Sequence, residues 1–110
     1  MMKHKIIKFR DHLAKLVLAG EKNVTWRLFD DKNLQKGDVV ELVNSNTGEI
    51  FGKAVLTDVR EKKMGELEEA DFDGHEKFSS DEEMYKTYRQ YYGGRVGPDT
   101  IVKIVRFRLL

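Results

Sequence analysis

The sequence predicts a mainly β, α+β fold: a small, mostly antiparallel β-barrel of about five or six strands with two or three flanking helices. Its 110 residues are 40% apolar, which fits a single domain over 1–110 with a modest core. Short apolar and alternating segments recur along the chain, but they do not alternate with helices as the strands of a parallel sheet do. Closing such strands into a barrel hides the edges that a short open sheet exposes.

The N-terminal part predicts a strand, a short helix and a second strand. Apolar residues among lysines at 6–9 indicate the first strand. Asp11 can cap the following helix, whose apolar residues recur at helical spacing. Gly20 ends this helix, because glycine takes the left-handed conformation without steric cost, and the chain then turns sharply into a strand at 22–28.

The middle of the chain predicts an antiparallel hairpin followed by an irregular segment. Residues 38–44 and 50–60 are strand candidates, and the segment 44–48 between them is rich in Asn and Gly, as tight hairpin connections are. The stretch 65–78 is acidic and irregular apart from one helical turn.

The C-terminal part predicts a helix and a half-buried strand. Ser80 and Glu83 form a capping-box pattern at the start of the helix, and two glycines at 93–94 end it. One face of this helix carries Met84, Tyr85, Tyr88, Tyr91 and Tyr92. Residues 100–109 end in a regular apolar and basic alternation, which is typical of a strand with one buried face.

Composition narrows the classes of function. The sequence has no run near the roughly 18 apolar residues of a membrane span and no recognisable leader, so we expect a cytoplasmic protein with no membrane partner. It has no cysteine, and its histidines at 4, 12 and 75 show no ligand spacing, so we expect no metal and no other cofactor. High Lys and Glu content without Cys is typical of a thermophile. The sequence does not predict an oligomeric state.

The formal net charge is only +1, but the charges are unevenly distributed. Residues 1–36 carry nine bases and four acids, residues 61–83 carry ten acids and three bases, and residues 95–110 are again basic. If the first and last strands are neighbours, their cations form a phosphate-binding strip of Lys3, Lys5, Lys8, Arg10, Lys103, Arg106 and Arg108. An ion-paired, solubilising surface is the alternative interpretation.

The predicted helix-to-strand corner carries a spaced motif, Gly20-x-Lys22-x-x-Thr25-x-Arg27, and Gly37-Asp38-x-Val40 follows ten residues later. This pattern resembles the signature of ASCH domains, which belong to the PUA-like superfamily of small β-barrels. The segments 51–55 and 71–76 and the terminal strand resemble the family in the same order. The resemblance covers nearly the whole chain and implies a PUA-like barrel.

The resemblance also implies a role with RNA. PUA-like barrels mostly bind RNA or modified nucleotides, so the first interpretation is an ASCH domain that binds RNA or a modified nucleoside in RNA metabolism or translation. The implied cleft lies between 20–27, the acidic 71–78 loop and the last helix. The binding residues expected in it are Gly20, Lys22, Trp26, Arg27, His75, Tyr88 and Arg106.

Thr25 supports an enzymatic alternative. The common ASCH motif has glutamate at this place. With threonine there, the chain resembles the compact ASCH proteins that hydrolyse N4-acetylcytidine to cytidine and acetate. The resemblance puts the catalytic lysine, threonine and glutamate on Lys22, Thr25 and Glu76. The other acids close enough in sequence to take the place of Glu76 are Glu69, Asp71 and Asp73.

The residue types at these three positions suit amide hydrolysis, which needs an activated nucleophile, a proton carrier and a group that stabilises the oxyanion.

A protein-interaction module without nucleic-acid contact is the third interpretation, because the net charge is near zero.

The candidates also have ordinary structural explanations. Trp26 fits a core position, the tyrosine-rich helix face can pack on the barrel, and a lone histidine such as His75 in a polar loop is more often solvated. Lys22 and Thr25 differ in strand parity and would point to opposite faces of a regular strand. They can share a site only if the corner at 22–23 is irregular.

Overall fold

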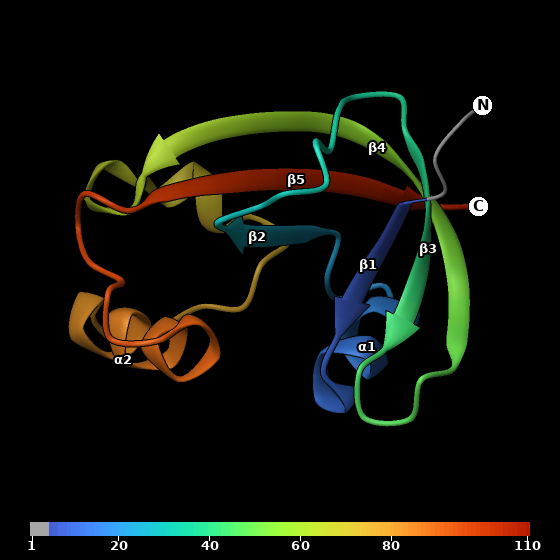
Figure 1. Ribbon diagram of the computed structural model, residues 1–110, viewed down its shortest axis with the longest axis horizontal. Helices are drawn as coiled ribbons and strands as arrows, with labels where there is room; N and C mark the ends of the chain where they lie inside the picture. Colours follow the sequence, from blue (N-terminus) through green and yellow to red (C-terminus); the bar gives the residue numbers. More distant parts are fainter. Residues whose placement is uncertain (1–4) are drawn as a thin grey trace.

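The computed structural model describes residues 5–110 as a small, mainly β, barrel-like α+β fold (Figure 1). In chain order its strands and α-helices are β1 (Lys5–Phe9), α1 (Asp11–Leu18), β2 (Val24–Leu28), β3 (Val39–Asn44), β4 (Ile50–Lys63), α2 (Asp81–Tyr92) and β5 (Ile101–Leu109). Two short 3-10 turns, η1 (Met64–Glu66) and η2 (Glu69–Phe72), lie in the acidic stretch between β4 and α2. The predicted fold class is therefore confirmed.

The strands form one curved sheet in the order β1-β3-β4-β5-β2. β1 runs parallel to β3, and the other three pairings are antiparallel. The two outermost strands, β1 and β2, are not paired with each other, so the sheet is a half-barrel with one opening. Side chains bridge this opening, because Arg27 Nη2 donates to Lys8 O (2.6 Å) and Lys32 Nζ donates to Ile6 O (2.6 Å).

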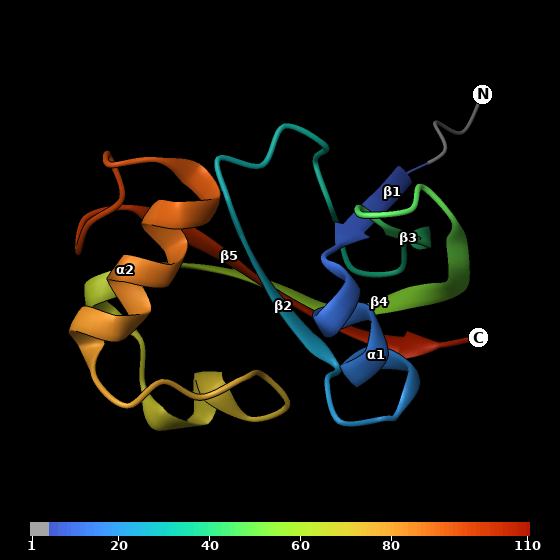
Figure 2. The same ribbon diagram turned by 90° about the horizontal axis from the view of Figure 1, so that it is seen from below.

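Two apolar clusters pack on the sheet. One joins α1 to β1, β3 and the C-terminal half of β5, around Phe9 and Val17. The other joins α2 to β2 and the N-terminal half of β5, around Trp26 and Met84. The helices consequently lie at opposite ends of the sheet, and β2 runs between them (Figure 2).

The turns occur where the glycines predict them. Gly20 ends α1 with a φ of 78°, in the left-handed region that glycine adopts easily. The next strand begins at Val24 rather than at residue 22, so Lys22 lies in the corner itself. Ser80 caps α2 as predicted, because its Oγ accepts a hydrogen bond from Glu83 N (3.2 Å).

The predicted cap of α1 was wrong. Arg10 is the N-cap residue and its side chain makes no capping hydrogen bond, whereas Asp11 is the first helical residue. The Asp11 carboxylate accepts from Asn44 Nδ2 (3.0 Å) and pairs with Lys15 Nζ (3.1 Å). It therefore ties the start of α1 to the end of β3.

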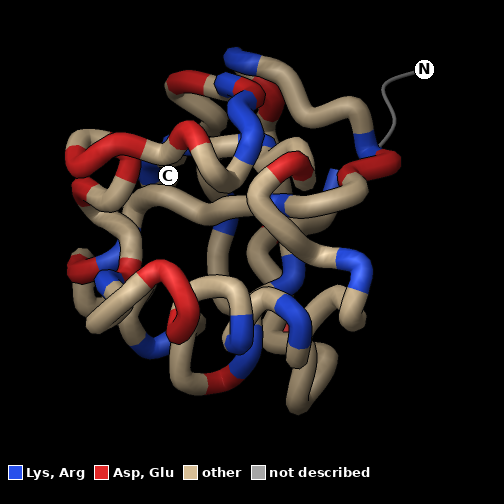
Figure 3. Tube along the Cα trace, turned by 90° about the vertical axis from the view of Figure 1, so that its left-hand side faces the viewer, with Lys and Arg blue, Asp and Glu red and all other residues tan. Residues whose placement is uncertain are grey.

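The phosphate-binding strip expected along the first and last strands is not formed. β3 and β4 separate β1 from β5, and cations of both strands are paired with acids. Lys5 pairs with Asp38 (2.6 Å) and Lys103 with Asp30 (2.9 Å). Lysines, arginines and acids are interspersed along the trace in Figure 3. Lys3 lies outside the described residues.

Neither helix of the described chain is long and apolar enough to cross a membrane. Within residues 5–110 there is also no group of three or more His, Cys, Asp or Glu side chains placed to hold a metal ion.

Candidate functional site

A cavity of about 220 Å³ opens between the two helices, beside β2. Its walls come from the end of β1 and the start of α1, from the 22–27 corner and strand, from the loop before α2, and from α2 itself. The lining residues are Lys8, Phe9, Arg10, Leu13, Lys22, Thr25, Trp26, Arg27, Ser45, His75, Glu76, Tyr88, Tyr91 and Tyr92.

Lys22 lies in the corner before β2, with only 3% of its surface exposed. Its Nζ donates to Glu76 Oε2 (2.6 Å) and to Val24 O (2.7 Å), so one of its three N–H groups remains for a ligand. Burial lowers the pKa of Lys22, Glu76 raises it, and the Arg27 charge lowers it further, with a net shift below the ordinary value. The irregular corner brings Lys22 and Thr25 to the same cavity despite their opposite parity.

The carboxylate of the site is that of Glu76. Asp71, one of the competing acids, pairs instead with Lys62 (2.8 Å). Burial alone would raise the pKa of Glu76, but the adjoining His75 and Lys22 lower it, and the net direction is below the ordinary value. The ionised form of Glu76 is therefore favoured beside the Lys22 amine.

Gly74 fixes the position of the loop that carries Glu76. Its carbonyl accepts hydrogen bonds from Asn23 N (3.0 Å) and Val24 N (3.3 Å), which docks the loop on the 22–24 corner. Gly74 has a φ of 79°, and a Cβ atom there would lie 1.8 Å from Asn23 Oδ1. Only glycine allows this close approach without a shift.

Thr25 and Arg27 share the cavity face of β2. Thr25 is buried, and its Oγ1 accepts a hydrogen bond from Arg27 Nε (3.1 Å). The Arg27 guanidinium also donates to Lys8 O and lies over the Phe9 ring, 5.0 Å from its centroid. These contacts fix a positive charge beside the threonine hydroxyl.

His75 is buried, so the expectation that it is solvated was wrong. It stacks on Trp26 with the ring centroids 3.9 Å apart. Its Nδ1 lies 2.8 Å from Glu76 O, which can only accept, so Nδ1 carries the proton and Nε2 accepts from Tyr88 Oη (3.1 Å). Burial and the Lys22 charge lower the pKa of His75 to about 4. His75 is consequently neutral at physiological pH and supports the wall of the site.

Trp26 is both a core residue, as expected, and part of the cavity wall. It is 2% exposed, and its Nε1 has no hydrogen-bond partner among the described residues. Tyr88 is also buried, and burial raises its pKa well above the ordinary value, so its hydroxyl stays protonated and donates to His75.

Two predicted binding residues do not line the cavity. Gly20 shapes the corner through its φ angle, and Arg106 donates from its guanidinium to Asp73 O (3.3 Å) and Ala70 O (3.2 Å). Arg106 therefore holds the acidic loop from β5. Gly20 and Arg106 were expected to bind a ligand, but they shape the corner and the loop instead. The family pattern includes such supporting residues as well as those that line the cavity.

Other lining residues had no site signal in the sequence. Phe9, Leu13 and Ser45 come from β1, α1 and the β3–β4 hairpin. The parallel pairing of β1 with β3 brings these segments to the cavity, and no local sequence pattern predicts that pairing.

The fold and the site define a half-barrel protein in which a buried lysine pairs with a half-buried glutamate in a small aromatic cavity. Its backbone is similar to that of a protein of Enterococcus faecalis V583 assigned to family DUF984, at 18% identity over 100% of this chain and 82% of that chain, with a TM-score of 0.79. It is similar to an ASCH domain from Lactobacillus crispatus, at 16% identity over 96% of this chain and 79% of the other, with a TM-score of 0.71.

A third similar structure is the hypothetical protein PH0355, at 23% identity over 99% of this chain and 100% of that chain, with a TM-score of 0.73. No protein-family model matches the sequence, and no curated protein matches it. The chain thus has the fold of the solved ASCH domain.

Proposed function

We propose that this protein is an ASCH-type amidohydrolase that removes the acetyl group from N4-acetylcytidine. The observation that carries the proposal is that Lys22, Thr25 and Glu76 line one cavity, with Lys22 Nζ 2.6 Å from Glu76 Oε2. The ASCH resemblance places the lysine, threonine and glutamate of this hydrolysis on the same residues. The fold shared with solved ASCH structures from Lactobacillus and Zymomonas supports this assignment.

Thr25 is the nucleophile in the proposed reaction. Its hydroxyl oxygen attacks the acetyl carbonyl carbon while neutral Lys22 accepts the hydroxyl proton, and the lowered pKa of Lys22 favours that neutral form. Arg27 donates to the Thr25 oxygen and supplies a positive charge beside the developing oxyanion.

The C–N bond breaks when the cytidine nitrogen receives a proton. Glu76 relays this proton from Lys22 across their direct contact. Water then hydrolyses the acetyl ester on Thr25, which releases acetate and restores the threonine hydroxyl.

The cavity suits a base with a small acyl group. Its volume of about 220 Å³ lies below the roughly 300–1,000 Å³ of sites for drug-sized ligands. Aromatic rings of Phe9, Tyr91 and Tyr92 line it, and rings of this kind stack well on bases. The ribose lies outside, near the exposed side chains of Lys8 and Arg10.

The test is acetate release from N4-acetylcytidine by the wild type and two variants of Thr25. Thr25→Ala removes the nucleophile and should lower the rate by at least about 100-fold, whereas Thr25→Ser keeps a hydroxyl and should retain part of the activity. A wild type that releases no acetate would overturn the proposal.

RNA binding without hydrolysis is a second candidate, and the exposed cations at the rim favour it. Lys8 and Arg10 stand at the mouth of the cavity and Arg27 lines it, where they can contact phosphates. If RNA is the ligand, affinity for a short RNA should fall steeply with added salt, with no acetate released. No binding and no acetate release would favour the protein-interaction module.

A further inference from the structure

A second cavity of about 200 Å³ adjoins the first along β2. The two cavities share Arg27 and Tyr92 in their walls. The remaining walls of the second cavity come from β1 and from the segment that follows β2: Ile6, Ile7, Leu28, Phe29, Asp30, Asp31, Lys32 and Leu34. The two cavities are therefore neighbours that meet at the Arg27 and Tyr92 side chains.

Phe29 is an exposed aromatic residue in an unfavourable backbone conformation. It has a φ of 54°, which is uncommon for a bulky side chain, and its side chain remains 45% exposed. The Arg95 guanidinium covers one face of the ring at 3.7 Å from the centroid, and Tyr92 approaches it at 6.1 Å. Strained conformations of this kind persist where the surrounding structure holds them, and they concentrate at functional sites.

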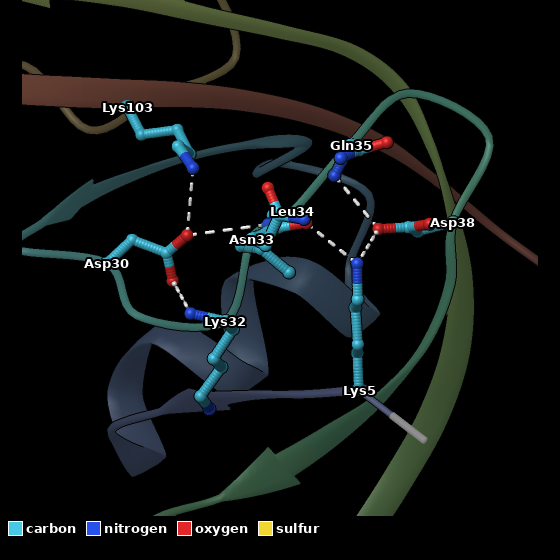
Figure 4. A network of polar contacts seen from close by, with 8 residues as sticks. All are labelled: Lys5, Asp30, Lys32, Asn33, Leu34, Gln35, Asp38 and Lys103. Carbon is cyan, nitrogen blue, oxygen red and sulfur yellow. Dashed lines mark hydrogen bonds and ion pairs between the residues drawn. The ribbon is translucent and has the colours of Figure 1, made fainter. Parts of the chain in front are cut away.

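A polar network holds the segment that presents Phe29 (Figure 4). The Asp30 carboxylate accepts from Lys103 Nζ (2.9 Å) and from the backbone N–H groups of Lys32 (3.1 Å) and Leu34 (3.4 Å). Farther along, Asp38 accepts from Lys5 Nζ (2.6 Å). Phe29 is thus presented by an ordered loop, which lowers the conformational entropy that a ligand must remove on binding.

The charges around the second cavity favour an anionic ligand. Arg27 and Lys32 line it, and Arg95 stands over the Phe29 ring. Lys103 neutralises Asp30, so Asp31 is the lining acid that opposes a phosphate. An exposed ring beside several cations is the combination that binds single-stranded nucleic acid, because the ring stacks on a base and the cations contact the backbone.

We propose that the second cavity is a subsite for the nucleotide next to the one in the first cavity, on a single-stranded RNA. Its base stacks on Phe29, and the linking phosphate lies near Arg27 and Lys32, at the junction of the two cavities. The inference rests on the proposed function, because it places a modified cytidine in the first cavity. It extends that function by making an oligonucleotide, rather than a free nucleoside, the preferred ligand.

The test compares two measurements on wild type and Phe29→Asn. One is the affinity for a fluorescent RNA tetranucleotide that contains a single N4-acetylcytidine, and the other is acetate release from the free nucleoside. Asparagine tolerates the left-handed conformation, so the substitution removes the ring and keeps the backbone. The tetranucleotide should bind at least about fivefold more weakly to the variant, while nucleoside turnover stays unchanged.

Ile50→Asn is the matched control, because Ile50 is 58% exposed and lines neither cavity. Arg95→Gln is a second variant, which should weaken tetranucleotide binding and reduce its dependence on salt.

Equal tetranucleotide affinity in wild type and Phe29→Asn would overturn the subsite, and so would a wild type that binds the tetranucleotide no more tightly than the nucleoside. Failure of the proposed hydrolysis has a different signature, because it abolishes acetate release and leaves the effect of Phe29 on tetranucleotide binding intact.

Discussion

The neutral state of His75 at the site makes the stability of the fold depend on pH. His75 is 6% exposed and has a pKa of about 4 in the folded chain, against an ordinary value of 6.5. The unfolded chain therefore takes up a proton near pH 6.5 that the folded chain accepts only near pH 4. The stabilisation that depends on neutral His75 is complete above pH 6.5 and is lost as the pH falls from 6.5 to 4.

We predict that the free energy of unfolding of the wild type falls by about 3 kcal/mol across this pH window through His75 alone. Urea unfolding at several pH values measures it. His75→Gln should be less stable at pH 7 but should show a flatter profile between pH 6.5 and 4.5, above the range where the carboxylates titrate. His12→Gln is the matched control, because it removes a histidine from an exposed position outside the site. The same slope in His75→Gln and wild type would contradict the prediction.

Lys22 gives the proposed hydrolysis a pH dependence of known sign. The reaction needs the neutral amine, so below the pKa of Lys22 the rate of acetate release should rise by about tenfold per pH unit. Glu76 raises the pKa of Lys22, whereas burial and Arg27 lower it. Glu76→Gln should therefore move the midpoint of the pH–rate profile to lower pH while reducing the maximal rate. The measurement is the single-turnover rate of acetate release at several pH values, because product release does not affect it. An unchanged midpoint would show that Lys22 is not the base.

At the scale of elements, the docking of the 73–76 loop on the corner before β2 assembles the site. Gly74→Ala should destabilise the fold by roughly 1–2 kcal/mol from the left-handed backbone, with a further cost from the contact with Asn23 Oδ1. Because the loop carries Glu76, the rate of acetate release should fall even at temperatures where the variant is still folded. Thermal unfolding and acetate release measure the two effects.

The Asn23→Ala background is the matched control for this substitution. It removes the contact with the Asn23 amide and leaves the backbone strain and a milder 3.3 Å approach to Val24 Cγ2, so Gly74→Ala should cost less there than in the wild type. Equal costs in both backgrounds would show that the Asn23 contact does not matter.

Local chemistry made several elements predictable. Gly20 marks the corner, the Asn- and Gly-rich 44–48 segment marks the hairpin, and Ser80 marks the start of α2, because each depends on residues a few positions apart. The burial of His75 depends on Trp26 and Tyr88, which are distant in sequence, and so the local polar context gave the wrong expectation.

At the scale of the whole molecule, the strand order lay beyond sequence reasoning. Parallel pairing of β1 with β3 encloses α1 in the connection between them, and it is fixed by packing among Phe9, Val17 and Leu42 rather than by a turn signal. The same pairing separates β1 from β5, which is why the expected basic strip is absent and why the opening of the half-barrel lies between β1 and β2.

Side chains bridge this opening, and Arg27 is one of the two links. Arg27→Gln removes the donation to Lys8 O, a charged hydrogen bond of about 1.5–3 kcal/mol, so amide hydrogen exchange in β1 should accelerate by at least about tenfold. Exchange in β4 and β5 should change much less, because these strands are paired on both sides. Lys32→Gln, which removes the donation to Ile6 O, should have the same effect and should add to it in the double variant. Equal acceleration in all strands would mean that Arg27 supports global stability instead of closing the half-barrel.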